Sequence, residues 1–281
     1  MSDSLLAYLN PFHWFSRGPK IAVVRLSGAI GLPWPAGGGG LSMASIAGPL
    51  ERAFRLKQLQ AVALAINSPG GSAVQSSLIA KRVRALAAEK KVPVLSFVED
   101  VAASGGYWLA TAGDEIFADE SSIVGSIGVI SSGFGFADLI QRIGVERRVH
   151  TSGPRKSMLD PFRPEQPEDL ARLERLQGEI HENFKAQVRQ RRAGRLKGEE
   201  AELFSGEFWT ARQALARGLI DGIGDLRNTL RERFGAKAKL VPVMARRGLF
   251  GRRLASGSLD GWAGQALAAT EERALWARFG L

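Results

Sequence analysis

The chain has 281 residues, a net charge of +10 and no cysteine. This length suits one large α/β domain or two small ones, and the lack of cysteine excludes disulfides, thiolate metal sites and a cysteine nucleophile. The positive charge favours an anionic partner, either nucleic acid or a membrane surface. Because the basic residues are scattered, with no stacking aromatic side chains between them, we favour the membrane and expect no nucleic acid.

Residues 1–19 are predicted to form an N-terminal arm. Met1 to Arg17 has no basic leader, and Pro11 interrupts its apolar run, so it does not resemble a secretory signal. It is also too short to span a bilayer. Its apolar side chains suit an anchor at a membrane surface and, equally, an arm that packs against the body or a partner subunit.

From Lys20 to His150, short apolar runs alternate with helical patterns. Residues 31–40 contain too much glycine and proline for regular structure and are predicted to be a mobile loop. Alternating strands and helices imply parallel pairing with crossovers, and therefore an α/β fold. The strands are expected at 21–26, 61–66, 92–98, 116–118, 127–130 and 145–150, and the helices at 43–56, 72–90, 107–112 and 136–143.

The second half of the sequence is more helical. A long helix is predicted over 167–195, with an apolar face that runs from Leu170 to Val188. Shorter helices are expected at 211–217 and 226–234, and a last strand at 240–243. Because no linker separates two cores, residues 20–243 are predicted to form one domain. Residues 244–281 are predicted to be a basic, amphipathic tail that faces a membrane or another subunit.

Ser104 lies on the turn between a predicted buried strand and a helix, with Gly105 and Gly106 behind it. This geometry exposes a hydroxyl and directs the first N–H groups of a helix at whatever the hydroxyl attacks. Taken alone, the pattern fits a helix N-cap better. However, the stretch Asn67-Ser68-Pro69-Gly70-Gly71 ends the preceding strand in the same way, so both turns are expected at one edge of the sheet.

Two backbone N–H groups can complete this site. Gly71 has no side chain, so its N–H can approach a substrate oxygen closely, and the N–H of Gly105 would supply a second donor to an oxyanion. Such a site performs acyl transfer if a base deprotonates the serine. The histidines are badly placed for that role. His13 lies in the N-terminal segment 1–19, His181 lies inside a long helix, and only His150, at a predicted strand end, is a candidate.

The sequence contains three motifs, Asn67-Ser68-Pro69-Gly70-Gly71, Ala103-Ser104-Gly105-Gly106-Tyr107 and Val124-Gly125-Ser126-Ile127-Gly128-Val129. In their order and spacing, these motifs together resemble the signal peptide peptidase A family of serine peptidases, and the resemblance covers roughly residues 20–243. It implies a Clp protease/crotonase-like fold, a repeated ββα spiral with a mostly parallel sheet.

The resemblance also implies a Ser–Lys dyad of Ser104 and Lys156. Lys156 matches the family lysine by its position after Ser-Gly, although Ser157 stands where an acidic residue is common. Arg155 cannot act as the base, because a guanidinium does not give up its proton near neutral pH. To act as a base, the Lys156 amine would have to be neutral, and burial away from water would favour this form because it disfavours the charged one. The alternative is a solvated loop cation. Ser126 is carried over as the hydroxyl that orients the lysine, and its alternative is a turn serine.

The function implied is that of a serine endopeptidase that hydrolyses signal-peptide remnants or other short, unfolded peptides through an acyl-enzyme. No cofactor or metal is expected. The family's short form assembles as a homo-oligomer in which a neighbouring subunit supplies the lysine, and the same is expected here. The alternatives are a crotonase-like acyl-CoA enzyme and an inactive, membrane-associated scaffold. We expect a cytoplasmic location, with peripheral binding at the inner membrane.

Overall fold

The computed structural model of the chain describes residues 18–31, 40–244, 269–270 and 272–281. Most of the predicted N-terminal arm, of the glycine-rich loop at 31–40 and of the C-terminal tail therefore lies outside the described residues. Within them, no helix is both long enough and apolar enough to cross a bilayer.

The fold is α/β with a mostly parallel sheet, as predicted. The strands run in the order β6-β5-β3-β2-β1-β8, with β4 between β3 and β7, and among the described strands only the β5–β6 pair is antiparallel. The long strand β3 pairs with β4 along its first half and with β5 along its second half. The strands are β1 (Lys20–Ser27), β2 (Leu59–Ser68), β3 (Val94–Ala103), β4 (Glu115–Ala118), β5 (Ile123–Gly125), β6 (Phe208–Thr210), β7 (Gly222–Ile223) and β8 (Lys239–Pro242).

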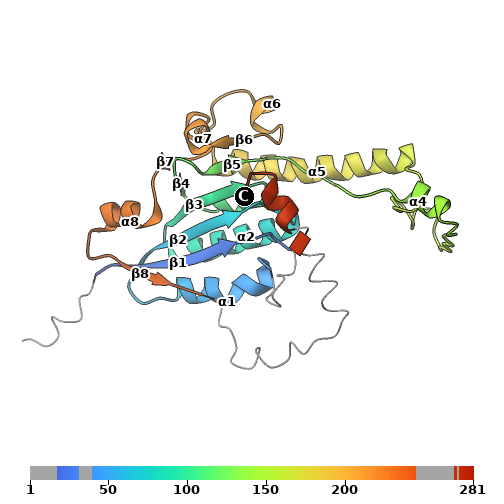
Figure 1. Ribbon diagram of the computed structural model, residues 1–281. Helices are drawn as coiled ribbons and strands as arrows, with labels where there is room; N and C mark the ends of the chain where they lie inside the picture. Colours follow the sequence, from blue (N-terminus) through green and yellow to red (C-terminus); the bar gives the residue numbers. More distant parts are fainter. Residues whose placement is uncertain (1–17, 32–39, 245–268, 271) are drawn as a thin grey trace, which may run out of the picture.

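Helices cover both faces of this sheet (Figure 1). Val62 and Leu64 of β2 belong to the core that includes the helices α1 and α2, whereas Ala63 packs with Leu230 of α8. Burial on both faces explains why β2 is an almost continuous apolar run. The helices are α1 (Met43–Phe54), α2 (Ala73–Lys90), α3 (Gly105–Ala110), α4 (Ala137–Arg142), α5 (Pro167–Arg191), α6 (Glu200–Leu203), α7 (Ala211–Ala216) and α8 (Leu226–Phe234).

Two predicted strands are wrong. Residues 127–130 follow β5 instead of forming a strand, because the backbone turns out of the sheet at Ser126, whose φ is +52°. Residues 145–150 are exposed and pair with no strand among the described residues, although Val145 and Val149 would fall on one face of a strand. Periodicity alone cannot supply a missing partner strand.

Residues 131–166, which we call the arm, lie outside the layered body. Figure 1 shows α5 running away from the sheet, with α4 near its far end. The predicted apolar face of α5 is only partly covered, since Phe184 and Val188 are its buried residues while Leu176 is 51% exposed. The helix ends at Arg191, four residues earlier than predicted.

A buried ion pair holds the near end of α5 to the body. Arg192 directly follows the helix, and its guanidinium donates to the carbonyl of Gly218 and to both carboxylate oxygens of Asp221, at 2.6 and 3.0 Å. Beside it, the Tyr107 hydroxyl donates to the carbonyl of Leu219. Burial raises the pKa of Tyr107 well above its ordinary value, so the hydroxyl keeps the proton that it donates.

Candidate active site

Ser104 lies between the end of β3 and the start of α3, in a backbone conformation that is rare for an L-residue. Its φ is +52° and its ψ is −120°. Its N–H donates to the carbonyl of Gly125 at 2.8 Å, and its carbonyl accepts from the N–H of Trp108 at 3.0 Å. The side chain occupies the N-cap position but makes no capping hydrogen bond. The simple N-cap interpretation is therefore wrong, and strain of this kind often marks a functional residue.

The loop after β2 holds Gly71 in a fixed place. The carbonyl of Gly70 accepts from the N–H of Ile30, and the N–H of Ser72 donates to the carbonyl of Ile30, both at 2.8 Å. The N–H of Gly71, between them, has no acceptor among the described residues. The φ of Gly71 is +135°, and an added Cβ would clash with the carbonyl oxygen of Ile30, so this position requires glycine.

The two glycine turns meet, as the sequence suggested that they could. A Cβ added at Gly70 would lie 2.8 Å from the Cβ of Ser104, and one added at Gly105 would lie 3.4 Å from the nitrogen of Gly71. Gly105 is the first residue of α3, so its N–H has no partner within the helix. Ser104, Gly71 and Gly105 thus form one cluster. The role of the two N–H groups as oxyanion donors stays a prediction.

Ser126 occupies the corresponding position on the neighbouring strand. Ala103 pairs with Gly125 across β3 and β5, so Ser104 and Ser126 are the next residues along two adjacent parallel strands. Both have a φ of +52°. Ser126 is buried, and its N–H donates to the carbonyl of Glu207 at 2.6 Å. The structure therefore places Ser126 beside the turn of Ser104, while its lysine-orienting role stays a prediction.

Ser104, Gly71 and Gly105 line a cavity of about 380 Å³. Its walls include Trp108 and Phe184, whose rings stack with their centroids 4.7 Å apart. This pair was not predicted from the sequence, although Trp108 lies four residues after Ser104 and therefore on the same helix face. The stack joins α3 to α5 beside the nucleophile turn.

The described part of the C-terminal tail also reaches this cavity. Leu275 and Arg278 line it, and Phe279 packs against Val101 and Ala103 at the end of β3. Phe279 also contacts the ring of Phe208, with the centroids 5.1 Å apart. No sequence pattern connects residues so far apart along the chain, so the position of this segment could not be predicted from the sequence.

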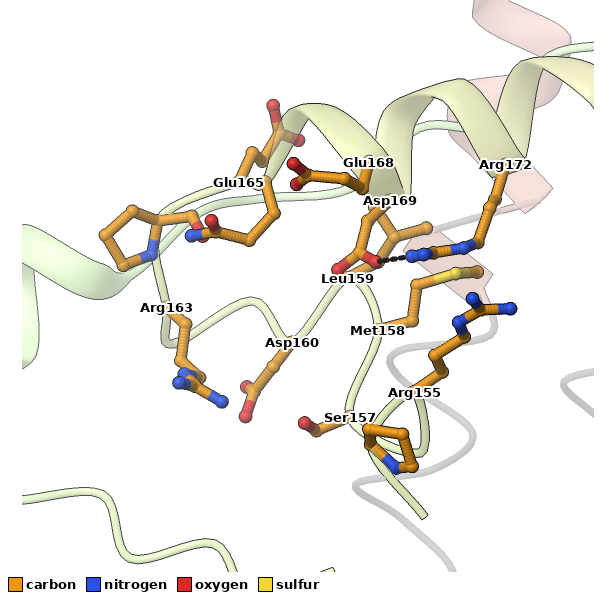
Figure 2. Close-up of a pocket in the computed structure, with 13 residues that line it drawn as sticks. Arg155, Ser157, Met158, Leu159, Asp160, Arg163, Glu165, Glu168, Asp169 and Arg172 are labelled. Atoms are coloured by element: carbon orange, nitrogen blue, oxygen red, sulfur yellow. Dashed lines mark hydrogen bonds and ion pairs between the residues drawn. The ribbon is translucent and has the colours of Figure 1, made fainter.

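Lys156 lies elsewhere, in the arm. Its side chain is exposed, and it is not among the residues that line the cavity of Ser104. The loop around it folds against the start of α5 and helps to form a second, charged cavity of about 530 Å³. Figure 2 shows Arg155, Asp160 and Arg172 among the residues that line it. Within one chain, the structure does not bring Lys156 to Ser104.

The fold and the serine–glycine cluster are those expected of an acyl-transfer enzyme. The chain belongs to Peptidase family S49, whose sequence profile matches residues 86–239. The matched stretch contains Ser104, Ser126 and Lys156, and it begins after Gly71.

Two curated relatives and one solved structure show the range of this similarity. The "Na(+)/H(+) antiporter NhaA" of Brucella abortus is 51% identical over 288 residues, which cover 99% of this chain and 39% of the Brucella protein. The "Serine protease SPPA, chloroplastic" of Arabidopsis thaliana is 31% identical over 211 residues, which cover 74% of this chain and 31% of the plant protein. This chain therefore spans well under half the length of these relatives.

The solved structure is the "1510-N membrane-bound stomatin-specific protease" in complex with a substrate peptide. It superposes with a TM-score of 0.50 and 13% identity, over 90% of this chain and 99% of that chain. At this level of identity, the likeness supports the Clp protease/crotonase-like fold alone.

Proposed function

We propose that the chain is a serine peptidase with Ser104 as its nucleophile. The observation that carries this proposal is the position of the Ser104 hydroxyl. It makes no capping hydrogen bond, and it lies in a strained turn beside the N–H groups of Gly71 and Gly105. A crotonase-like acyl-CoA enzyme would need the two N–H groups but no nucleophile there. Membership of a peptidase family supports the same choice.

The reaction would proceed through an acyl-enzyme. Ser104 Oγ attacks the peptide carbonyl carbon while its proton passes to the neutral Nζ of Lys156. The N–H groups of Gly71 and Gly105 donate to the oxyanion. As the C–N bond breaks, Lys156 returns the proton to the leaving amine. Water then attacks the ester, with Lys156 again accepting the proton, and the acid product and free Ser104 are released.

In this proposal, the lysine comes from a second copy of the chain. The arm lies near the far end of α5 (Figure 1), and Lys156 within it is exposed and does not line the cavity of Ser104. The same region exposes apolar side chains, among them Phe134, Ile143 and Leu176. Exposed apolar surface of this kind is typical of an interface. A homo-oligomer would cover these side chains and exclude water from the amine of Lys156. This desolvation would favour the neutral amine, which is the form that can act as a base.

The cavity supports short peptides as substrates. Trp108, Phe184 and Ile180 give it apolar walls beside Ser104, which suits small or apolar side chains near the cut. Signal-peptide remnants and other unfolded, membrane-derived peptides have this chemistry. We also propose a cytoplasmic location with contact at the inner membrane, which fractionation with and without Met1 to Arg17 would test.

The test combines active-site labelling with mixed assemblies. Ser104→Ala should abolish labelling by a fluorophosphonate probe, and both Ser104→Ala and Lys156→Ala should lower peptide hydrolysis by roughly a thousandfold or more. Co-expression of the two variants should restore about a quarter of the wild-type rate, because one site in four combines an intact serine with an intact lysine from the neighbour.

The outcomes separate the parts of the proposal. Wild-type protein that is neither labelled at Ser104 nor able to cleave casein or signal peptides would refute the peptidase. Active wild-type protein, dead single variants and no restoration on co-expression would place the dyad within one chain.

A further inference from the structure

An ion pair closes the loop that carries Lys156. The Nε of Arg147 donates to both carboxylate oxygens of Asp160, at 3.0 and 2.9 Å. The two residues are 13 positions apart, and Lys156 lies between them. The side chain of Asp160 is only 4% exposed, in an arm whose residues are otherwise mostly exposed. The Arg147 side chain is 42% exposed, so the pair is only half-buried, and its two hydrogen bonds to one carboxylate fix the geometry of the loop closure.

Two aromatic residues strengthen this closure. The N–H of Phe162 donates to Asp160 Oδ1 at 3.1 Å, and the guanidinium of Arg147 lies 4.8 Å from the centroid of the Phe162 ring. Phe136 contacts the same ring, at 5.6 Å between centroids, and its N–H donates to the carbonyl of Pro161 at 2.6 Å. We call Phe136, Arg147, Asp160 and Phe162 the clasp. It ties the start of the arm to its end.

The neighbouring arginine provides a comparison for the clasp. Arg148 also makes two hydrogen bonds to a carboxylate, that of Glu146, at 2.6 and 3.0 Å. That pair joins residues two positions apart, and its side chains are 75% and 70% exposed. It therefore closes no loop. Arg148 is thus a matched control for Arg147, because it is also an arginine paired with a carboxylate but does not connect the two ends of the loop that carries Lys156.

We infer that Arg147 and Asp160 are positioning residues for the amine of Lys156. This inference rests on the proposed function. Closing the loop before assembly removes conformational freedom that the loop would otherwise lose when the amine docks near Ser104 of the neighbour. The turn that carries Lys156, whose N–H donates to the carbonyl of Gly153 at 3.2 Å, is then presented in one place. A misplacement of about 1 Å can cost roughly a hundredfold in rate.

The experiment compares Arg147→Ala with Arg148→Ala in the full chain. Arg147→Ala should lower kcat for peptide hydrolysis at least about tenfold, with KM within about twofold. Asp160→Asn should behave alike, and Arg147→Lys, which keeps the charge and one donor, should recover part of kcat. Arg148→Ala should keep the wild-type kcat. Thermal unfolding of the sheet should be the same in all of these proteins, because the clasp lies outside the body.

The possible results are distinct. Wild-type kcat in Arg147→Ala, or an equal loss in Arg148→Ala, would overturn the positioning role while the peptidase function stood. If Arg147→Ala failed to form the oligomer, kcat would be measured in Asp160→Asn and Arg147→Lys, provided that these variants assemble. Wild-type kcat in both would overturn the inference. Wild-type protein without Ser104-dependent hydrolysis would remove the function and, with it, the inference.

Discussion

The sheet edge around Ser104 and the arm around Lys156 are built in opposite ways. At the sheet edge, Ser104 and Ser126 have strained backbones that hydrogen bonds between neighbouring turns and strands hold in place. In the arm, most side chains are exposed, and the clasp is the principal tie. A single chain thus positions Ser104, the proposed nucleophile, whereas Lys156, the proposed base, lies in the exposed arm. This difference is the main reason to propose a shared site.

The largest effect on stability is expected where the two regions join. Arg192→Met removes the buried guanidinium that donates to the Asp221 carboxylate and to the Gly218 carbonyl, which should cost about 3–5 kcal/mol of unfolding free energy. Denaturant unfolding measures this loss. Arg195→Ala is the control, because Arg195 binds the same carboxylate at 3.2 Å but is 43% exposed, and it should cost less than about 1 kcal/mol. Equal losses would show that burial does not set the strength of this junction.

An intermediate effect is expected on the outward face of α5. Leu176→Lys places a charge on an exposed apolar position, and loss of a buried leucine at an interface costs about 1.5–3 kcal/mol. Self-association should therefore weaken roughly tenfold or more, and hydrolysis should fall with it, while monomer unfolding is unchanged. Analytical ultracentrifugation measures the association. Leu215→Lys, at another exposed leucine, on α7, should leave association intact, so equal weakening by both would contradict an interface centred on α5.

The smallest effect is expected at α8, far from both regions. Asp225 caps this helix by accepting from the N–H groups of Arg227 and Asn228. Asp225→Ala should cost about 1 kcal/mol at pH 7 and leave hydrolysis unchanged. The backbone hydrogen bond from Asn228 lowers the pKa of Asp225 below its unfolded value, so the stabilisation is full above the unfolded pKa.

This stabilisation is lost as the pH falls through the folded pKa. The difference in unfolding free energy between wild type and Asp225→Ala should therefore shrink below about pH 4. Unfolding at pH 7 and at pH 3 measures the change. A difference that does not vary with pH would show that the charge of the cap does not contribute.

Local patterns were enough to predict the layered body. The strand at 61–66 and the helices at 43–56 and 226–234 follow from apolar runs and caps within each segment, and the fold class was confirmed. The glycine turns at Gly71 and Ser104 were also found from the sequence. Periodicity showed which face of α5 is apolar, but it could not show that Leu176 is left uncovered, because covering depends on distant parts of the chain or on other chains. The contact of Phe279 with β3 was missed for the same reason.

The length of α5 has a consequence for how this architecture can change. The helix has 25 residues, which corresponds to about 37 Å at 1.5 Å per residue. Since Arg192 anchors one end, each inserted or deleted residue would rotate the other end by about 100° and shift it by about 1.5 Å. The number of residues in α5 therefore fixes the direction in which its far end faces, and this direction can change only in steps of one residue. Only changes close to whole turns, such as about seven residues, would preserve that direction.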